Sequence, residues 1–376
     1  MNPPLKVMWL GLRGFPGVQG GVETHAQNIC PILVNLGCDV HVLTRAFYQN
    51  EPHRRSWKGI RFHNLWSPKV KGVEAFIHTF IGVLYAGLIN RPDVLHIHAV
   101  GPMLFTPLAR LFGLKVVVTH HGPDYDRQKW SSFAKKLLRL GECMGMQWAS
   151  ERIVISSVIR KIIHKAYSKE SVLIPNGVSR PAALVSSAVL DEYSLTPGRY
   201  IVLVSRLVPE KRHIDLIKAF DKASGEPGLE GWKLAIVGSA EHPDDYTQEV
   251  LVEAENTENV ICTGFKTGAD LETLYTNAGI FVLPSSHEGL PIAMLEALSY
   301  GLSVIVSDIP ANLEVGLPEK HYFPLGDVDA LSQKLVAFSS VPISEEDKNK
   351  LQAWVTDNYS WDVIAQNTLD VYKSCG

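Results

Sequence analysis

Short apolar runs alternate along this chain with longer stretches in which apolar residues recur at helical spacing. Apolar runs of this length are typical of buried strands, and polar, glycine-containing loops often follow them. Regular alternation of strands and helices predicts parallel sheets of the doubly wound α/β type, in which ligands bind at the carboxyl ends of the strands. The expected strands are Lys6–Leu10, Asp39–Arg45, Ile60–Leu65, Val94–Val100, Lys115–Gly122, the start of Arg199–Phe220, Lys233–Gly238, Asn259–Phe265, Gly279–Pro284 and Leu302–Pro310.

The length of the chain predicts two domains. It has 376 residues, and single hydrophobic cores stop growing at about 250–300 residues. The segment Arg180–Gly198 is rich in Pro, Ala and Ser and weakly patterned, so the linker is expected there. The domains are therefore placed at residues 1–183 and 184–357, and a last helix is expected at Trp361–Ser374.

The most informative stretch is Pro284–Gly301, with the sequence PSSHEGLPIAMLEALSYG. A polar loop follows the predicted strand, and a helix is expected to begin with Pro291, whose missing N–H costs nothing at the first helical position. Gly301 is expected to follow the helix C-cap. A strand, a glycine-containing loop and a helix N-terminus together make an anion site, because backbone N–H groups and the helix dipole point at the loop.

Two carboxylates bracket this predicted anion site. Glu288 lies in the loop, and Glu296 lies in the helix, roughly 8 Å along its axis. An elongated ligand fits them, with a phosphate-bearing middle at the helix N-terminus and a hydroxyl-rich group at each carboxylate. The alternative is a pair of solvated glutamates at chance spacing.

Two cations follow the first strand of the second domain. Arg206 and Lys211 flank a turn ahead of a predicted helix. The fork of an Arg and the point charge of a Lys at a strand end can neutralise a diphosphate leaving group. The alternative is a solvated pair of surface cations.

The first strand of the chain runs into a glycine-rich loop that ends with Gly20 and Gly21. Glycine turns in this place let the backbone approach a phosphate closely. The spacing is not the G-x-G-x-x-G of dinucleotide sites, and no acidic residue marks a ribose at the end of the second strand. A tight strand–helix turn is therefore the alternative.

Histidines gather at two predicted strand ends. His96 and His98 form an H-x-H pair, and His120 and His121 form a second pair. Alternate residues of a strand share one face, so His96 and His98 are expected to lie together. A metal hydrolase is therefore a possible function, although no further strand-end ligand completes a recognisable set. The Asp124–Asp126 stretch likewise imitates the D-x-D of metal-dependent glycosyltransferases.

These motifs, in this order, resemble those of retaining glycosyltransferase family 4, which has the GT-B fold of two Rossmann-like doubly wound domains facing a central cleft. The spacing of Glu288 and Glu296 resembles the E-x7-E signature of that family. The cation segment resembles G-R-L-x-x-E-K-G, with Ser205 and Arg212 in place of its two glycines. The remaining matches are T-x-H-G at Thr119–Gly122 and an N-terminal loop similar to R-G-x-P…G-G-x-E-T. Arg152–Ser156 and Ser171–Val178 resemble the last two N-domain strands of the family, the second followed by its P-N-G-V turn.

The resemblance implies a role for each matched residue. His121 would lie near the donor sugar, Glu288 would contact that sugar, and Glu296 would hold the ribose hydroxyls. Arg206 and Lys211 would stabilise charge on the leaving group. The implied donor-binding set is Gly20, Gly21, Arg206, Lys211, Gly264, Phe265, Glu288, Gly289, Leu290 and Glu296, with Gly264 and Phe265 beside the base. The GT-B fold also implies that a helix at about 358–376 packs back onto the first domain.

The implied enzyme moves a sugar from a nucleoside-diphosphate sugar to an acceptor hydroxyl with retention at the anomeric carbon, and it needs no metal or other cofactor. A saccharide or lipid-linked acceptor is expected. The N-terminal loop favours bacterial cell-surface polysaccharide assembly, with rhamnosyl transfer as one option. Two alternatives share the fold and the donor: a nucleotide-sugar epimerase, which needs no acceptor, and a non-catalytic nucleotide-sugar-binding protein.

Charge is divided unevenly along the chain. Residues 1–185 hold 23 Lys and Arg against 10 Asp and Glu, whereas residues 186–376 hold 13 against 29. The excess of positive charge in residues 1–185 indicates an anionic partner for the first domain. The lack of basic clusters interleaved with aromatic residues disfavours nucleic acid as that partner. We expect peripheral, salt-reversible contact with an anionic membrane, without insertion. The alternative is that these cations balance the acidic second domain. The cations expected at the membrane are Arg54, Arg55, Lys69, Lys71 and, in a helix within Trp130–Ser150, Lys135, Lys136 and Arg139.

Other features favour a cytoplasmic location. The N-terminus resembles a first strand and not a signal peptide, because no long apolar run follows a charged segment. Five scattered cysteines without metal-type spacing favour a reduced compartment. The longest apolar stretch, Ala75–Asn90, falls short of the ~20 residues that span a bilayer and is expected to be a buried core helix.

Overall fold

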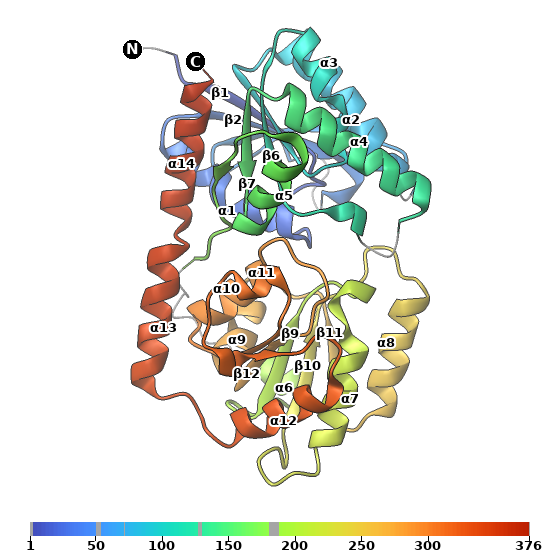
Figure 1. Ribbon diagram of the computed structural model, residues 1–376, viewed down its shortest axis with the longest axis vertical. Coiled ribbons are helices and arrows are strands. Elements are labelled where there is room, and N and C mark those ends of the chain that lie inside the picture. Colours follow the sequence, from blue (N-terminus) through green and yellow to red (C-terminus); the bar gives the residue numbers. More distant parts are fainter. Residues whose placement is uncertain (1–2, 50–53, 71, 127–129, 180–187, 376) are drawn as a thin grey trace. The chain divides into compact units, whose positions relative to one another are not determined.

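A computed structural model of the chain describes residues 3–49, 54–70, 72–126, 130–179 and 188–375. The chain divides into two compact units, which are described separately (Figure 1). Unit 1 comprises Met1–Gly177 together with Trp361–Gly376, and unit 2 comprises Val178–Ser360. Both units consist of a largely parallel sheet with helices, as the alternating pattern predicts.

Unit 1 is built on an eight-stranded sheet in the order β3-β4-β2-β1-β5-β6-β7-β8. All neighbouring strands in it are parallel except β3 and β4. The strand order reverses between β1 and β5, so the loops that follow these two strands lie at the topological switch point. The strands are β1 (Lys6–Leu10), β2 (Asp39–Arg45), β3 (Ser56–Trp57), β4 (Ile60–Leu65), β5 (Val94–His98), β6 (Lys115–His120), β7 (Glu151–Val154) and β8 (Val172–Leu173).

The helices of unit 1 occupy the connections between these strands. The last helix of the chain, α14 (Trp361–Ser374), is the exception, because it comes from the far end of the sequence. The others are α1 (Gly21–Asn35), η1 (Ala46–Tyr48), α2 (Val73–Tyr85), the π-helical η2 (Ala86–Asn90), η3 (Pro102–Phe105), α3 (Thr106–Leu111), η4 (Asp124–Asp126), α4 (Ser132–Trp148) and α5 (Ser157–Tyr167).

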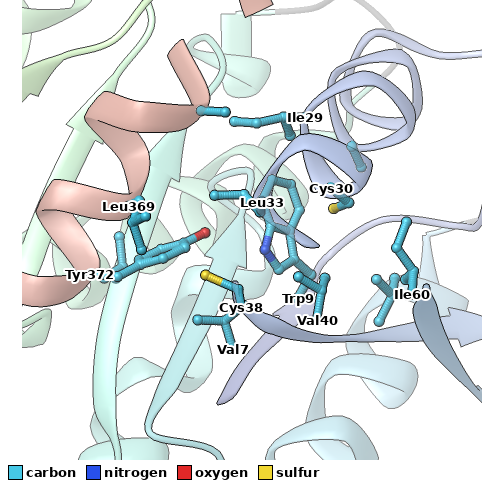
Figure 2. Close-up of a cluster of buried hydrophobic side chains, with 14 of the residues drawn as sticks. Val7, Trp9, Ile29, Cys30, Leu33, Cys38, Val40, Ile60, Leu369 and Tyr372 are labelled. Carbon is cyan, nitrogen blue, oxygen red and sulfur yellow. The ribbon is translucent and has the colours of Figure 1, made fainter. Parts of the chain in front are cut away.

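Helix α14 packs against α1 and completes the core of unit 1. Figure 2 shows Leu369 and Tyr372 of α14 facing Leu33 of α1 and Trp9 of β1. Trp9 and Tyr372 are both almost fully buried. The Tyr372 hydroxyl also lies 2.6 Å from Nδ1 of His96, which ties the helix to β5. The C-terminal segment is therefore an integral part of the first core.

Helix α2 differs from the buried core helix that its composition predicts. Its inward face carries the polar residues Glu74, His78 and Thr79, followed by Gly82 and Val83. A Cβ at Gly82 would lie 2.7 Å from Cδ1 of Leu10, so the helix approaches the sheet too closely for a larger residue at this position. Val73, Phe76 and Phe80 point outward, and 39% of Val73–Asn90 is buried. By length and composition alone, this segment could cross a membrane.

Unit 2 is built on a six-stranded sheet in the order β11-β10-β9-β12-β13-β14, in which all neighbours are parallel. Its strand order reverses between β9 and β12. The strands are β9 (Tyr200–Val204), β10 (Lys233–Val237), β11 (Val260–Gly264), β12 (Ile280–Leu283), β13 (Ser303–Ser307) and β14 (Tyr322–Phe323). The helices are α6 (Ala188–Glu192), η5 (Pro209–Lys211), α7 (His213–Ala223), α8 (Asp245–Asn256), α9 (Gly268–Asn277), α10 (Ile292–Ser299), α11 (Pro310–Leu313), η6 (Glu319–His321), α12 (Val328–Ser339) and α13 (Glu345–Asn358).

The division between the units falls at residues 177/178 and 360/361, a few residues from the predicted 183/184 and 357/358. The reason is local pairing, because Val178 forms a parallel bridge with Ser360 and its N–H donates to the carbonyl oxygen of Tyr359 at 2.8 Å. These residues therefore belong to unit 2. Of the predicted linker, residues 180–187 lie outside the described residues, and α6 occupies part of the remainder.

Tyr372→Ala should lower the free energy of unfolding by about 3–5 kcal/mol, because it removes a fully buried ring. Tyr372→Phe keeps the ring and removes only the hydroxyl bonded to His96, so it should cost about 1–2 kcal/mol. Urea denaturation followed by circular dichroism measures both changes. An alanine variant as stable as the wild type would show that α14 is not part of the core.

Candidate functional site

The sequence-predicted phosphate site lies at the switch point of the unit 2 sheet. The β9 strand leads into Arg206 and η5, and the neighbouring β12 strand leads into the loop that carries Glu288. The Ser286 N–H donates to the carbonyl oxygen of Glu210 at 2.8 Å, which joins the two segments through their backbones. Parallel strands end at one edge of a sheet, so residues far apart in sequence meet here.

An ion pair crosses the same junction. Nζ of Lys211 lies 2.5 Å from Oε1 of Glu288. The Lys211 side chain is 17% exposed and the Glu288 side chain 10% exposed, so the pair is largely shielded from water yet reachable from the surface. A desolvated pair has a stronger mutual attraction than one in bulk water. Lys211 is thus held in a fixed place beside the loop that opens α10.

Helix α10 begins one residue later than predicted. Pro291 is its N-cap, with φ −74° and ψ 107°, and Ile292 is the first helical residue. The backbone nitrogen of Pro291 carries no hydrogen, so it needs no acceptor at this position. At the other end, Gly301 has φ +71° and its N–H donates to Leu298, as expected for the residue after the C-cap. The N-terminal N–H groups of the helix point toward the loop of Glu288 and Gly289, where an anion is favoured.

Glu296 lies one turn further along α10, and its carboxylate accepts a hydrogen bond from the Tyr275 hydroxyl at 3.0 Å. Burial raises the pKa of Glu296 to about 7, and the Tyr275 hydrogen bond works in the opposite direction. The Tyr275 ring stacks on Tyr300 with centroids 5.2 Å apart, which holds the Tyr275 hydroxyl in place beside Glu296. This carboxylate is therefore prepared to accept hydroxyl hydrogen bonds, most strongly once it is ionised.

The two departures from the cation motif have structural explanations. Ser205 is buried, and its hydroxyl lies 2.9 Å from Nε2 of His213, so its side chain turns away from the junction. Arg212 adopts the left-handed conformation that glycine favours, with φ +52° and ψ 44°, at a cost of about 1 kcal/mol. Its side chain forms an ion pair with Asp215. Neither departure moves Arg206 or Lys211 from the strand end.

The remaining predicted donor-site residues in unit 2 lie around the same sheet edge. Gly264 ends β11, two strands from β9, and its carbonyl oxygen accepts from the Gly238 N–H at 2.9 Å. Phe265 follows with its ring exposed, as a surface for stacking requires. Leu290 is buried, so its side chain is shielded from a ligand.

In unit 1, His121 belongs to a cluster of aromatic rings behind the switch point of β1 and β5. Its Nε2 lies 3.0 Å from Nδ1 of His98, and its ring meets that of His25 at 5.2 Å. Trp9 stacks on His98 with centroids 4.2 Å apart. Burial, followed by the proximity of His25, His96 and His120, keeps the pKa of His121 well below its ordinary value. His121 is therefore a neutral imidazole at physiological pH.

His96 and His98 lie together, as predicted, with ring centroids 4.0 Å apart. Both nitrogens of His96 are engaged, one with Tyr372 and the other with the Thr119 hydroxyl at 2.6 Å. Among the residues that the structure describes, the histidine cluster does not bring three ligand atoms within 4.8 Å of one another. His96 therefore acts as a structural residue that links β5, β6 and α14.

Gly20 and Gly21 lie at the start of α1. A Cβ at Gly20 would lie 2.1 Å from Oε2 of Glu23 and 2.4 Å from Nη2 of Arg13, so glycine is needed where the loop closes over this ion pair. Gly21 is exposed, with open space where a side chain would extend. The first glycine thus has a packing role, and the second leaves backbone accessible to a ligand.

A buried network that the sequence analysis missed holds the chain on either side of His121. The Gly122 N–H donates to Nδ1 of His120, so the proton of this imidazole is on Nε2, which donates to Glu142 at 2.7 Å. Tyr125 and Tyr167 also donate to Glu142, at 3.1 and 2.6 Å. Burial would raise the pKa of Glu142, but these donors outweigh it and the pKa lies below the usual value.

The sequence carries only weak signals for Glu142 and His25, which the sequence analysis missed. Glu142 lies within an apolar helical pattern and resembles any helix-surface glutamate, and His25 lies in a helix with no partner nearby in sequence. Of the predicted site residues, those of unit 2 gather at one sheet edge. Gly20, Gly21 and His121 belong to unit 1, where the two glycines lie at the start of α1 and His121 lies in the loop after β6.

Two protein-family models match the chain in succession. Residues 19–180 match the model described as Glycosyltransferase Family 4, and residues 193–361 match the model described as Glycosyl transferases group 1. The two matches meet close to the division between the units.

Curated relatives include several glycosyltransferases. An uncharacterized glycosyltransferase of Methanocaldococcus jannaschii is 30% identical over 46% of this chain and 45% of its own length. The UDP-Gal:α-D-GlcNAc-diphosphoundecaprenol α-1,3-galactosyltransferase of Escherichia coli is 27% identical over 66% of each chain. The lipopolysaccharide 1,6-galactosyltransferase of Salmonella typhimurium is 24% identical over 86% of this chain and 87% of its own. Matches to the first four curated relatives cover between 45% and 66% of their lengths.

Similar solved structures cover nearly the whole chain. The sucrose-phosphate synthase of Thermosynechococcus elongatus has a TM-score of 0.79 at 19% identity, with 98% of each chain covered. Anabaena HepE in complex with UDP and glucose has a TM-score of 0.76 at 16% identity, with 98% of this chain and 100% of that chain covered. At these identities the likeness establishes the fold, which is GT-B as predicted.

Glu142→Gln should lower the free energy of unfolding by about 1–3 kcal/mol at neutral pH, because one of three buried donors loses its acceptor. The pKa of Glu142 is lowered in the folded state, so its contribution is present above the unfolded value of 4.5 and is lost as the pH falls below it. The difference between variant and wild type should therefore shrink at about pH 4. Urea denaturation at both pH values measures it. Glu170→Gln, on a side chain that is 90% exposed, is the control, and equal effects of the two variants would contradict the network.

Proposed function

We propose that this chain, a family 4-like glycosyltransferase with the GT-B fold, moves a sugar from a nucleoside-diphosphate sugar to an acceptor hydroxyl with retention at the anomeric carbon. The single observation that carries the proposal is the junction at the unit 2 switch point. There, Lys211 and the N-terminus of α10 place positive charge beside one loop, Arg206 follows β9 at the same sheet edge, and Glu288 and Glu296 supply carboxylates from the loop and from the helix.

The leaving diphosphate is assigned to the cations and the helix N-terminus. Negative charge develops on it as the bond to the sugar breaks, and fixed donors that need no reorganisation stabilise that charge most effectively. The ion pair with Glu288 keeps Lys211 in position before the donor arrives. Arg206 adds a planar fork suited to phosphate oxygens.

The two carboxylates have different assignments. Glu296 accepts the ribose hydroxyls, because its carboxylate is oriented by Tyr275 within the helix. Glu288 contacts the donor sugar from the loop, with backbone of Gly289 and Leu290 beside it. Phe265, exposed after Gly264, offers a ring to the nucleotide base.

His121 is assigned to the donor sugar, as a neutral imidazole that can donate or accept a hydrogen bond without bringing a charge. The accessible backbone at Gly21 and its neighbour Gly20 is assigned to the donor diphosphate or the acceptor. The leaving phosphate oxygen accepts the proton of the acceptor hydroxyl on the same face of the sugar, which gives retention without a covalent intermediate. No metal or other cofactor takes part in this scheme.

The expected donor is a UDP-sugar. A relative is named for UDP-galactose and diphosphoundecaprenol, and a solved structural neighbour carries UDP. These relatives also favour a saccharide or lipid-linked acceptor in bacterial surface-polysaccharide assembly, on the cytoplasmic side of the membrane. Rhamnosyl transfer, favoured by the N-terminal loop, remains one choice of sugar.

The two glutamates should have separable kinetic effects. Glu296→Gln should weaken UDP binding by about 1.5–3 kcal/mol, because an amide accepts ribose hydroxyl bonds less strongly than a carboxylate. Since the pKa of Glu296 is about 7, wild-type affinity for UDP should rise with pH through neutrality, and the variant should be insensitive. Glu288→Gln should chiefly lower kcat.

Calorimetric titration with UDP and a donor-turnover assay measure these effects. Glu258→Gln, an exposed carboxylate in the same unit, is the control. Wild-type binding and turnover in both glutamate variants would overturn the site. Conversion of the donor sugar to its epimer without any acceptor would identify an epimerase, and UDP binding without turnover would identify a binding protein.

Turnover should survive excess EDTA, because Arg206 and Lys211 take the role of a divalent cation at the diphosphate. Activity is compared before chelation, after it, and after addition of Mg²⁺ or Zn²⁺. Full loss on chelation with recovery on metal addition would contradict this assignment and direct attention to Asp124 and Asp126 or to the histidine cluster.

A further inference from the structure

Helix α2 has the polarity of its two faces reversed relative to an ordinary surface helix. Its buried face carries an ion pair between Glu74 and Nη1 of Arg45 at 2.9 Å, with the Tyr48 hydroxyl donating to the same carboxylate. His78 on that face is completely buried. Water-soluble helices bury their apolar stripe and expose their polar one, so the sequence of α2 calls for an apolar environment on its outer side.

The outer side of α2 is a continuous apolar stripe. Val73, Phe76 and Phe80 are spaced at i, i+3 and i+7, and the two phenylalanines are each 42% exposed. Leu88 and Ile89 continue it in η2, with Ile89 70% exposed. From Val73 to Asn90 the only charged residue is the buried Glu74. This outer side therefore offers no charged group to water.

A second helix adds cations beside this stripe. On α4, Phe133 is 76% exposed, and Lys136 and Leu140 lie on the same helical stripe. Lys136 and Arg139 are exposed, whereas the only acidic residue of α4 is the buried Glu142. Apolar residues next to cations without exposed carboxylates are the pattern of helices that lie in the interface of an anionic bilayer.

The two helices are parts of one surface. Both pack on η3, where the Phe105 ring lies 4.8 Å from that of Phe76 and 5.7 Å from that of Phe80. At their N-terminal ends, a Cβ at Gly72 would lie 3.7 Å from the Trp130 ring. We call the exposed set Val73, Phe76, Phe80, Phe133, Lys136, Arg139 and Leu140 the α2–α4 face.

We propose that the α2–α4 face binds an anionic phospholipid surface, with the phenylalanines of α2 inserted at the level of the headgroups and the cations of α4 contacting lipid phosphates. This differs from the contact through charge alone that the sequence analysis predicts. The helix lies in the plane of the membrane and does not span it, because the Glu74–Arg45 pair fastens its other side to unit 1. Neither helix exposes a carboxylate, so the face presents only apolar groups and cations, which matches an anionic lipid surface.

Sedimentation with vesicles tests the proposal on the full chain. Wild-type protein should bind vesicles of POPC and POPG better than vesicles of POPC alone, and part of the binding should persist at high salt. F76S/F80S should reduce the partition coefficient for the mixed vesicles by about tenfold or more, because two apolar side chains lose their burial. K136Q/R139Q should remove the preference for POPG.

The matched control is V252S/V341S, which changes two exposed apolar residues of unit 2. It should bind vesicles like the wild type, and all variants should keep the wild-type melting temperature and affinity for UDP. F76S/F80S binding equal to wild type, or wild-type binding abolished by salt, would overturn insertion. Loss of a dimer in F76S/F80S by analytical ultracentrifugation would instead assign the face to a second copy of the chain.

The outcome is independent of the transfer chemistry. Wild-type protein that is stabilised by UDP but ignores both kinds of vesicle would refute the membrane face and leave the proposed function standing. Protein that binds vesicles but no nucleotide would support the membrane face and refute the proposed function.

Discussion

The reversal of strand order between β9 and β12 is the constraint on which the candidate site depends. Parallel strands on either side of a switch point send their following loops in different directions, which leaves room for a ligand above the strand ends. In unit 2, one of these loops supplies Arg206 and Lys211, and the other supplies Glu288 and the N-terminus of α10. The Ser286–Glu210 hydrogen bond and the Lys211–Glu288 ion pair then fix the two loops to each other.

Unit 1 uses its polar groups differently. Beside His121, the His120 imidazole and the hydroxyls of Tyr125 and Tyr167 all bond to Glu142, and the Gly122 N–H donates to His120, which fixes the chain at Gly122. Such networks rigidify a site when every member has a partner. The same unit places polar residues on the inner side of α2 and exposes apolar residues on its outer side, where contact with water is unfavourable.

Much of the fold follows from the sequence pattern, because buried parallel strands are short apolar runs with turn residues at their ends. β1, β2 and β4 have the predicted bounds, as does α14. The short β3 and β14 strands were missed, since two residues carry no periodicity. The prediction for α2 was wrong because composition records how apolar a helix is and not which face meets the sheet. That choice depends on Gly82 approaching Leu10, which is a tertiary contact.

The residues of the candidate site likewise fall into those that the sequence pattern predicts and those that it does not. Glu288, Glu296, Arg206 and Lys211 could be predicted because each lies at a fixed offset from a strand end or helix start. Glu142 and His25 could not, because their partners Tyr167 and Asn176 come from other elements of the fold. The pKa of Glu296 also depends on burial beside Tyr275, which no spacing reveals.

Nucleotide binding at the unit 2 switch point is the central claim, and thermal denaturation with a panel of UDP, GDP, dTDP and CDP tests it most directly. A bound ligand stabilises the folded state in proportion to the logarithm of its concentration over Kd. We expect UDP to raise the melting temperature most, Arg206→Gln to abolish the shift, and Arg199→Gln, at an exposed arginine of the same unit, to retain it. No shift with any of the four nucleotides, or an undiminished shift in Arg206→Gln, would contradict the account.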